Sequence, residues 1–133
     1  MQDLSHFFES PHFIEQQESN TYEPLQLGAT IQYAVDGNFD WEDADIVIIG
    51  CGEQRGATRG AKYSNAPDAI REELYKMYSW HPAVKIVDAG NIREGANIYD
   101  TKAALRTVLH ELQEAGKTAI VLGGAHDLTM QQY

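Results

Sequence analysis

The residues best placed for chemistry form the run Gly123-Gly-Ala-His-Asp127. The run follows residues 118–122, an apolar, β-branched stretch that predicts a buried strand. Because paired glycines let the backbone turn sharply, the His126 imidazole would point into the crevice above the strand. A histidine there can bind a metal, transfer protons or hydrogen-bond a neighbouring loop. No His-x₃-His or paired-carboxylate motif accompanies it, so the residues alone favour a structural role over metal binding.

Polar residues also follow two earlier apolar runs. Residues 45–50 lead into Gly50-Cys-Gly-Glu-Gln-Arg-Gly56, whose GxGxxxG spacing only loosely resembles a dinucleotide-binding loop. Glycines that permit a tight exit from a strand explain this run more simply, and we expect Cys51 to be a small buried thiol. Residues 84–88 are closed by Ala89-Gly90-Asn91. Asp88 could bind a ribose, orient a ligand or form a turn, and the turn is the favoured role.

Two helical patterns separate these runs. Residues 65–78 have a possible cap at Ser64 or Asn65, and their apolar residues recur at helical spacing: Ala66, Ile70, Leu74 and Met77. We expect Arg71 to anchor this helix rather than to bind substrate. A second helix runs from Asp100, its expected cap, to a stop at Gly116, with one apolar face: Leu105, Val108, Leu112 and Ala115.

The alternation of strands and helices predicts the α/β class, a parallel sheet with right-handed crossovers and helices covering it. Ligands of such sheets bind beyond the carboxyl ends of the strands. Only three parallel strands and two crossover helices are predicted, and both edges of that sheet would expose unpaired backbone. We therefore expect the sequence to be the N-terminal portion of a longer protein, or a domain that pairs with other chains.

The charge of the chain is uneven. The 133 residues include 20 acidic and 10 basic side chains, a net charge of −10, and residues 1–44 contain no Lys or Arg. This acidity argues against binding to nucleic acids or to anionic membranes. No apolar run approaches the ~20 residues of a membrane span, no signal peptide is visible, and a single cysteine suits a reducing compartment. We expect a cytoplasmic protein.

Residues 1–44, the acidic arm, mix aromatic side chains with polar ones and with the breakers Pro11 and Pro24. This composition predicts an arm that packs onto residues 45–133 rather than a domain of its own. A partly disordered tail is the alternative, which the aromatic residues disfavour.

Three segments, taken in order, resemble the N-terminal half of the ureohydrolase family of arginase, agmatinase and formimidoylglutamase. Gly56-Ala-Thr-Arg-Gly60 with Asn65-Ala-Pro-Asp-Ala-Ile-Arg71 resembles the family's Gly-rich loop and "G-P-x-A-I-R" helix start. Val87-Asp-Ala-Gly-Asn91 resembles the second strand, commonly "D-x-G-D". Leu122-Gly-Gly-Ala-His-Asp127 resembles the first metal-binding motif.

The sequence also departs from the family pattern. Asn65-Ala66 replaces the usual glycine before Pro67, and Asn91 stands where an acid is common. Ala125 before the histidine and Asp127 after it lean toward the formimidoylglutamase branch. The substrate stays open among guanidino and formimino compounds.

The resemblance implies a three-layer αβα fold with a parallel sheet, here truncated after about three core strands. It also implies a hydrolase that uses two manganese ions to present hydroxide to the carbon of a guanidino or formimino group. His126 would bind one manganese, and Gly123, Gly124 and Asp127 would support that motif. The complete enzyme would be a homo-oligomer.

The family's other ligands come from "D-x-H-x-D" and "D-x-D" motifs, which do not occur after His126 in this sequence. On this hypothesis the 133-residue chain carries no catalytic residue, is inactive alone and does not stably bind manganese. Residues that bind substrate are not assigned. The alternative hypothesis is a non-catalytic α/β module that binds a small ligand at its strand ends or mediates an interaction.

Overall fold

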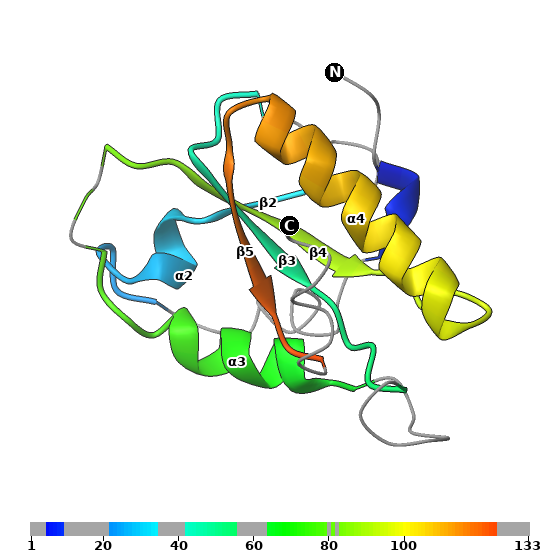
Figure 1. Cartoon of the computed structure of the whole chain (residues 1–133). Helices are drawn as coiled ribbons and strands as arrows, with labels where there is room; N and C mark the ends of the chain where they lie inside the picture. The colour runs from blue at the N-terminus through cyan, green and yellow to red at the C-terminus, as the bar shows by residue number, and fades with distance from the viewer. Residues whose placement is uncertain are drawn as a thin grey trace.

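The computed structural model describes residues 5–9, 22–34, 42–55, 64–79, 81 and 83–124. The elements are η1 (Ser5–Phe7), β1 (Phe8–Glu9), α2 (Leu27–Thr30), β2 (Gln32–Tyr33), β3 (Ile46–Gly50), α3 (Ala66–Leu74), β4 (Ile86–Ile92), α4 (Ile98–Glu114) and β5 (Thr118–Leu122), as Figure 1 shows. None of the helices in these residues is long and apolar enough to span a membrane.

The core of the sheet consists of three parallel strands. β3 lies at the centre, with β4 on one side and β5 on the other, and both pairings are parallel. The connections run through α3 and α4, as the alternation of elements predicts. β1 pairs with β4 in the antiparallel sense, so the whole sheet is mixed. The prediction of an α/β fold with a parallel core is confirmed.

Two short strands of the acidic arm cover the outer edge of β4. Phe8 of β1 lies opposite Ile92, and β2 runs parallel to β4 with Tyr33 opposite Asp88. Phe8 is also buried against the core. The expectation that both edges of the sheet lack partners is therefore wrong at β4, since segments remote in sequence supply the missing pairing.

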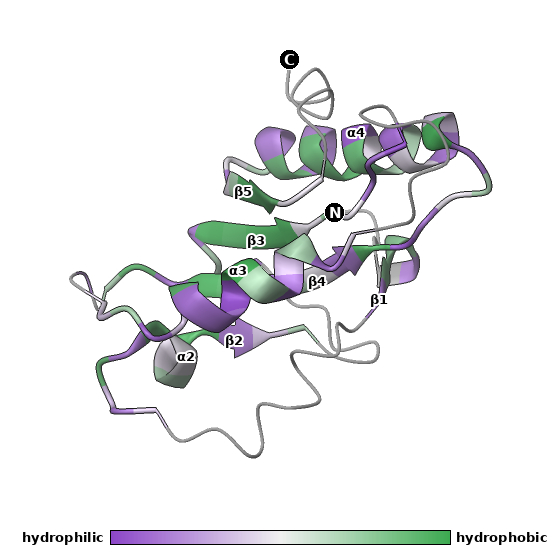
Figure 2. Ribbon diagram, turned by 90° about the horizontal axis from the view of Figure 1, so that it is seen from below, coloured by the Kyte–Doolittle hydropathy of each residue, from purple (hydrophilic) through white to green (hydrophobic). Residues whose placement is uncertain are grey.

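Helices cover both faces of the sheet. Alternate residues of β3, Val47 and Ile49, pack with α4 in one hydrophobic cluster. Ile48, between them, belongs to a second cluster with Tyr75 and Leu122. Figure 1 shows α4 on one side of the strands and α3 with α2 on the other, and Figure 2 shows β3 as a hydrophobic layer between helices of mixed character. This is the predicted three-layer αβα arrangement.

The long helix α4 begins earlier than its sequence pattern indicates. The Asn97 side chain accepts a hydrogen bond from the Asp100 backbone N–H at 3.0 Å, so Asn97 is the cap and the prediction of Asp100 is wrong. The predicted apolar residues Leu105, Val108 and Leu112 are fully buried, whereas Ala115 is exposed at the end of the helix. Gly116 follows with φ +74°, the conformation that favours glycine after a helix.

The predicted apolar face of α3 is only partly present: Leu74 packs against the second hydrophobic cluster, but Ile70 and Met77 do not turn inward. Ile70 and Met77 are 40% and 59% exposed, and the helix itself ends at Leu74. Its buried residues are Pro67 and Arg71. Arg71 turns toward the sheet because its charged partner, Asp88, lies there. The side of α3 that faces the sheet is therefore not purely apolar.

The start of α3 and the end of β4 also differ from the pattern. Ser64 Oγ accepts a hydrogen bond from the Ala66 N–H at 3.0 Å, while Asn65, at the cap position, makes no side-chain capping bond. β4 continues to Ile92 instead of ending at Asp88, because β1 and Gly50 pair with its last residues.

We predict that Leu105→Ala lowers the free energy of unfolding by about 2–5 kcal/mol, because it leaves a cavity between α4 and the sheet. The matched control is Leu25→Ala, at a leucine that is 62% exposed, for which we expect a change within about 0.5 kcal/mol. Urea unfolding measures both. Equal losses at the two positions would contradict the assignment of Leu105 to the core.

Candidate site at the carboxyl edge of the sheet

The carboxyl ends of β3, β4 and β5 share one edge of the sheet. There the Cys51 N–H donates to the Leu122 carbonyl oxygen at 3.0 Å, which ties the exits of β3 and β5 together. Gly123 and Gly124 follow with φ +81° and +79°, so the predicted glycine turn is present. A Cβ on Gly123 would lie 2.7 Å from Pro67 Cδ, which excludes a side chain there. His126 and Asp127 lie outside the described residues, and their roles stay predictions.

Four polar side chains are buried among the described residues, and they belong to two clusters near this edge: Arg71 with Asp88, and Glu53 with Thr101. Burying an ionised group is costly unless it is paired and hydrogen-bonded. Each buried carboxylate in the described part of the chain has an arginine as its partner.

The first cluster joins α3 to β4. Arg71 Nε and Nη2 donate to the two carboxylate oxygens of Asp88 at 2.8 and 3.0 Å, and both side chains are fully buried. The Tyr75 hydroxyl and the Gly90 N–H also donate to Asp88. The prediction that Arg71 anchors its helix is confirmed. The favoured turn role for Asp88 describes only part of what it does: its Oδ1 accepts the Gly90 N–H two residues on, but Asp88 lies inside β4 and also holds α3.

Arg71 also fixes the end of β4. Its Nη1 donates to Asn91 Oδ1 at 2.5 Å and to Asp68 Oδ1 at 3.1 Å, and its Nη2 donates to the Gly90 carbonyl at 3.0 Å. The Asn91 amide lies so close to β3 that a Cβ on Gly50 would meet Asn91 Oδ1 at 1.8 Å. Glycine at position 50 is therefore needed because Asn91 approaches so closely, and not only to allow a tight exit from the strand.

The pKa values of two tyrosines and of Arg71 in this first cluster are raised. Burial, reinforced by Asp88, raises the pKa of Tyr33 and of Tyr75 well above the usual tyrosine value. Burial alone would lower the pKa of Arg71, but the charge and the hydrogen bonds of Asp88, with smaller contributions from Tyr75 and Asp68, together outweigh burial and raise that pKa. The tyrosines stay protonated and Arg71 stays charged, so this cluster has the character of a structural anchor rather than an acid–base site.

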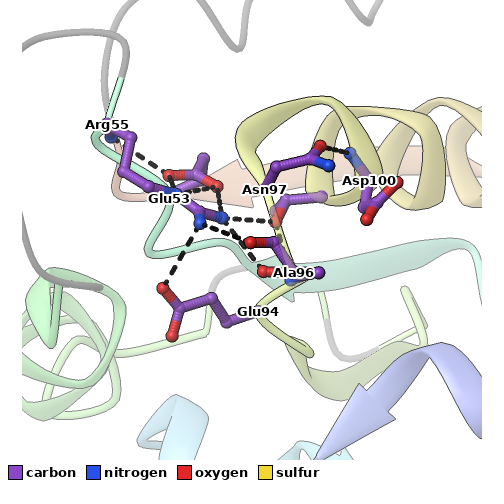
Figure 3. Close-up of polar contacts among 8 residues, drawn as sticks. Glu53, Arg55, Glu94, Ala96, Asn97 and Asp100 are labelled. Atoms are coloured by element: carbon purple, nitrogen blue, oxygen red, sulfur yellow. Dashed lines mark hydrogen bonds and ion pairs between the residues drawn. The ribbon is translucent and has the colours of Figure 1, made fainter. Parts of the chain in front are cut away.

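The second cluster follows β3 directly (Figure 3). Arg55 Nε donates to Glu53 Oε2 at 2.9 Å and its Nη2 to Oε1 at 2.5 Å. Glu53 is 1% exposed, whereas the Arg55 side chain is 23% exposed. Hydrogen bonds from Arg55 hold the pKa of Glu53 at about 2, against the opposing effect of burial. Glu53 is thus a carboxylate at all ordinary pH values.

Sequence reasoning missed this second cluster, because it explained residues 50–56 by the glycines alone. The available signal was an acid and a base two residues apart, directly after a buried strand. A carboxylate at that place is buried with the strand and needs a nearby cation.

The described residues do not form a metal centre. No group of three His, Cys, Asp or Glu side chains among them comes together in a way that could hold an ion. The buried acids are already bound by arginine, and His81 and His110 are exposed. The donor set in the described part of the chain therefore does not fit a two-manganese site.

The protein has a three-layer α/β fold. In such folds, ligands usually bind beyond the carboxyl ends of the parallel strands, which here lie together at one edge of the sheet. The profile of the arginase family matches residues 44–133, which is more than half of the chain. The chain therefore belongs to the arginase family.

The similar curated proteins include formimidoylglutamases. That of Hahella chejuensis is 37% identical over 65 residues, which cover 49% of this chain and 20% of that protein. That of Klebsiella pneumoniae is 33% identical over 87 residues, covering 62% of this chain and 27% of that protein. The chain thus spans less than a third of the length of these relatives.

Two solved structures are similar to this chain in fold. A formiminoglutamase variant of Trypanosoma cruzi, solved with Mn²⁺, has a TM-score of 0.61 and 27% identity, over 72% of this chain and 36% of that one. An agmatine ureohydrolase of Thermoplasma volcanium has a TM-score of 0.58 at 20% identity, over 89% of this chain and 40% of that one, and supports the fold alone.

We predict that Asp88→Asn lowers the free energy of unfolding by about 3–5 kcal/mol, because it leaves the Arg71 charge buried without its counter-charge. The control is Glu73→Gln, which breaks the exposed pair with Lys76 and should cost less than about 0.5 kcal/mol. Combining Asp88→Asn with Arg71→Met should recover part of the loss. Similar urea unfolding curves for Asp88→Asn and Glu73→Gln would refute the buried-pair interpretation.

The pairing of Glu53 also predicts acid sensitivity. Its pKa of about 2 in the folded chain lies below the usual glutamate value, so the unfolded chain binds more protons between about pH 5 and pH 2. The stabilisation is complete above that window and is lost as the pH falls through it, by on the order of 2 kcal/mol.

Glu53→Gln should flatten the dependence of unfolding free energy on pH in this window, whereas Glu72→Gln, at an exposed residue of α3, should leave it unchanged. Denaturant titrations at several pH values between 5 and 2 measure the slope. A Glu53→Gln curve as steep as that of the unsubstituted chain would show that Glu53 is not held ionised by Arg55.

Proposed function

We propose that the protein carrying this sequence hydrolyses a C–N bond of a linear amidine, with a formimino compound preferred over a guanidino one. The observation that carries the proposal is the arginase-family match over residues 44–133, within which the similar curated proteins are formimidoylglutamases. Asp127 after the histidine, where the formimidoylglutamase branch has an acid, supports the same choice.

We propose manganese as the cofactor, with His126 as a ligand of one of two ions. The support is the motif around His126 and the manganese in a similar formiminoglutamase. The described residues contribute the base of the site rather than ligands, since their buried acids are bound by arginine. The glycine turn at Gly123 and Gly124 directly follows β5, two residues before His126 in the sequence, and Gly123 is fixed against Pro67.

Other parts of the proposal rest on the sequence alone. Residues 1–44 are an arm added to the family domain, which we place at residues 45–133. The full protein is a cytoplasmic homo-oligomer. The 133-residue chain by itself neither hydrolyses the substrate nor binds manganese stoichiometrically, because one motif histidine cannot hold two ions.

One observation favours the alternative of a non-catalytic binding module. Within the described residues every buried carboxylate is already paired, and no group of metal donors is present. A module of this kind would bind a small ligand at the strand ends without turnover.

The test is hydrolysis by the full-length protein that carries this sequence, loaded with Mn²⁺, on formimidoylglutamate, agmatine and arginine. We expect formimidoylglutamate to be preferred, and His126→Ala to lower kcat/KM by roughly 100-fold or more, since even outer-shell changes at metal sites cost about 10–100-fold. His110→Ala, at an exposed position of α4, is the matched control.

Turnover that survives His126→Ala would exclude His126 as a manganese ligand. Absence of turnover on all three substrates, with one of them still binding in calorimetry, would support the non-catalytic module instead.

A further inference from the structure

Arg55 lies where three separate parts of the chain meet. Its Nη2 donates to the Gly95 carbonyl at 3.2 Å and to Thr101 Oγ1 at 3.3 Å, and its Nη1 donates to the Ala96 carbonyl at 3.4 Å. Gly95 and Ala96 belong to the connection between β4 and α4, and Thr101 to the first turn of α4. Figure 3 shows the guanidinium between Glu53 and this connection. One side chain therefore joins the exit of β3 to the start of α4.

Glu53 orients that guanidinium. Its carboxylate receives Arg55 Nε and Nη2, and its Oε2 also accepts the Arg55 backbone N–H at 3.0 Å. Both the backbone N–H and the guanidinium of Arg55 therefore donate to the same carboxylate. A planar guanidinium held in this way loses little conformational entropy when it donates to further acceptors. A lysine, which has a single ammonium group, is therefore not equivalent to an arginine at this position.

Thr101 completes the cluster from the other side. Its Oγ1 accepts the Gly95 N–H at 2.8 Å as well as the Arg55 contact, and the residue is fully buried. Gly95 is itself packed tightly, since a Cβ there would lie 2.5 Å from Asp100 Cβ. The connection 93–97 is therefore held at Gly95 by both its N–H and its carbonyl.

We propose that Arg55, oriented by Glu53, is a positioning residue of the active-site edge, and that it fixes the exit of β3 against the β4–α4 connection. The inference rests on the proposed function for its catalytic consequence. On the other side of β4, Arg71 holds Gly90 and Asn91. One guanidinium thus holds the end of β4 at residues 90–91, and the other holds the connection that follows at residues 95–96.

The arrangement argues against Arg55 as a substrate-binding group. Each of its three guanidinium nitrogens donates to an oxygen of the chain. Among the described residues, two further carboxylates act on it: Glu94, whose Oε1 lies 4.0 Å from Nη1, and Asp100. Glu53 in turn is buried and bound by Arg55, so it cannot take up a proton near neutral pH. Both residues act through the backbone segments that they hold.

The experiment compares Arg55→Gln and Arg55→Lys in the full-length protein, with Lys76→Gln in the exposed pair with Glu73 as control. Hydrogen exchange is followed at the Gly95 and Thr101 amides, and kcat and KM are measured under conditions where urea unfolding shows each variant to be folded. We expect exchange at these amides to accelerate about 10-fold or more in Arg55→Gln. We expect kcat to fall by roughly 10–100-fold with little change in KM, as for a misplaced catalytic group.

Arg55→Lys is the decisive variant. A lysine keeps the charge beside Glu53 but lacks the fork that reaches Gly95, Ala96 and Thr101. We expect Arg55→Lys to recover most of the unfolding free energy that Arg55→Gln loses. Hydrogen exchange at Gly95 and Thr101, and kcat, should nevertheless remain close to their values in Arg55→Gln. Full recovery of exchange and kcat by lysine, or unchanged exchange in Arg55→Gln, would overturn the proposal.

Two further outcomes are separable. If the unsubstituted protein has no turnover, the proposed function fails and the catalytic part of this inference fails with it, while exchange still decides whether Arg55 holds the connection. If Arg55→Gln does not fold, Glu53→Gln keeps Arg55 and Thr101 but removes the carboxylate that orients the guanidinium. Unchanged exchange at the Gly95 amide in that variant would count against the proposal that Arg55, oriented by Glu53, holds the connection.

Discussion

The buried ion pair between Arg71 and Asp88 is the constraint on which the rest of the structure depends. Both side chains are fully excluded from water, so neither charge is tolerable without the other. The pair dictates where α3 lies over β4 and which of its faces is turned inward. Ile70 stays largely exposed because the inward position is taken by an arginine rather than by an apolar residue. A polar contact, not an apolar stripe, sets the orientation of this helix.

The same pair explains the glycines at the edge of the sheet. With α3 fixed by Arg71, Pro67 is brought against Gly123, and Asn91 is drawn toward Gly50. Neither glycine has room for a side chain, although Gly50 ends β3 and Gly123 follows β5. Glycine is required at both positions because of where α3 lies. The close packing of the strand ends therefore depends on the same buried ion pair that fixes this helix.

Local patterns predicted the elements well, and long-range polar pairs account for the differences. β3, β5 and the buried face of α4 follow from runs and periods of apolar residues, which need no knowledge of distant partners. The inward face of α3 could not be predicted in this way, because the partner of Arg71 lies 17 residues further on. The division at residues 44 and 45 and the role of His126 remain predictions.

The three segments that resemble the ureohydrolases are separate in the sequence but meet in the structure. Pro67 and Arg71 come from the first, Asp88 and Asn91 from the second, and Gly123 from the third. Arg71 binds the second segment, and Pro67 touches the third. Their order and spacing are therefore constrained by a single packing arrangement at the carboxyl edge, before any metal or substrate is considered. This is a physical reason why weak motifs, each unspecific alone, together identify the family.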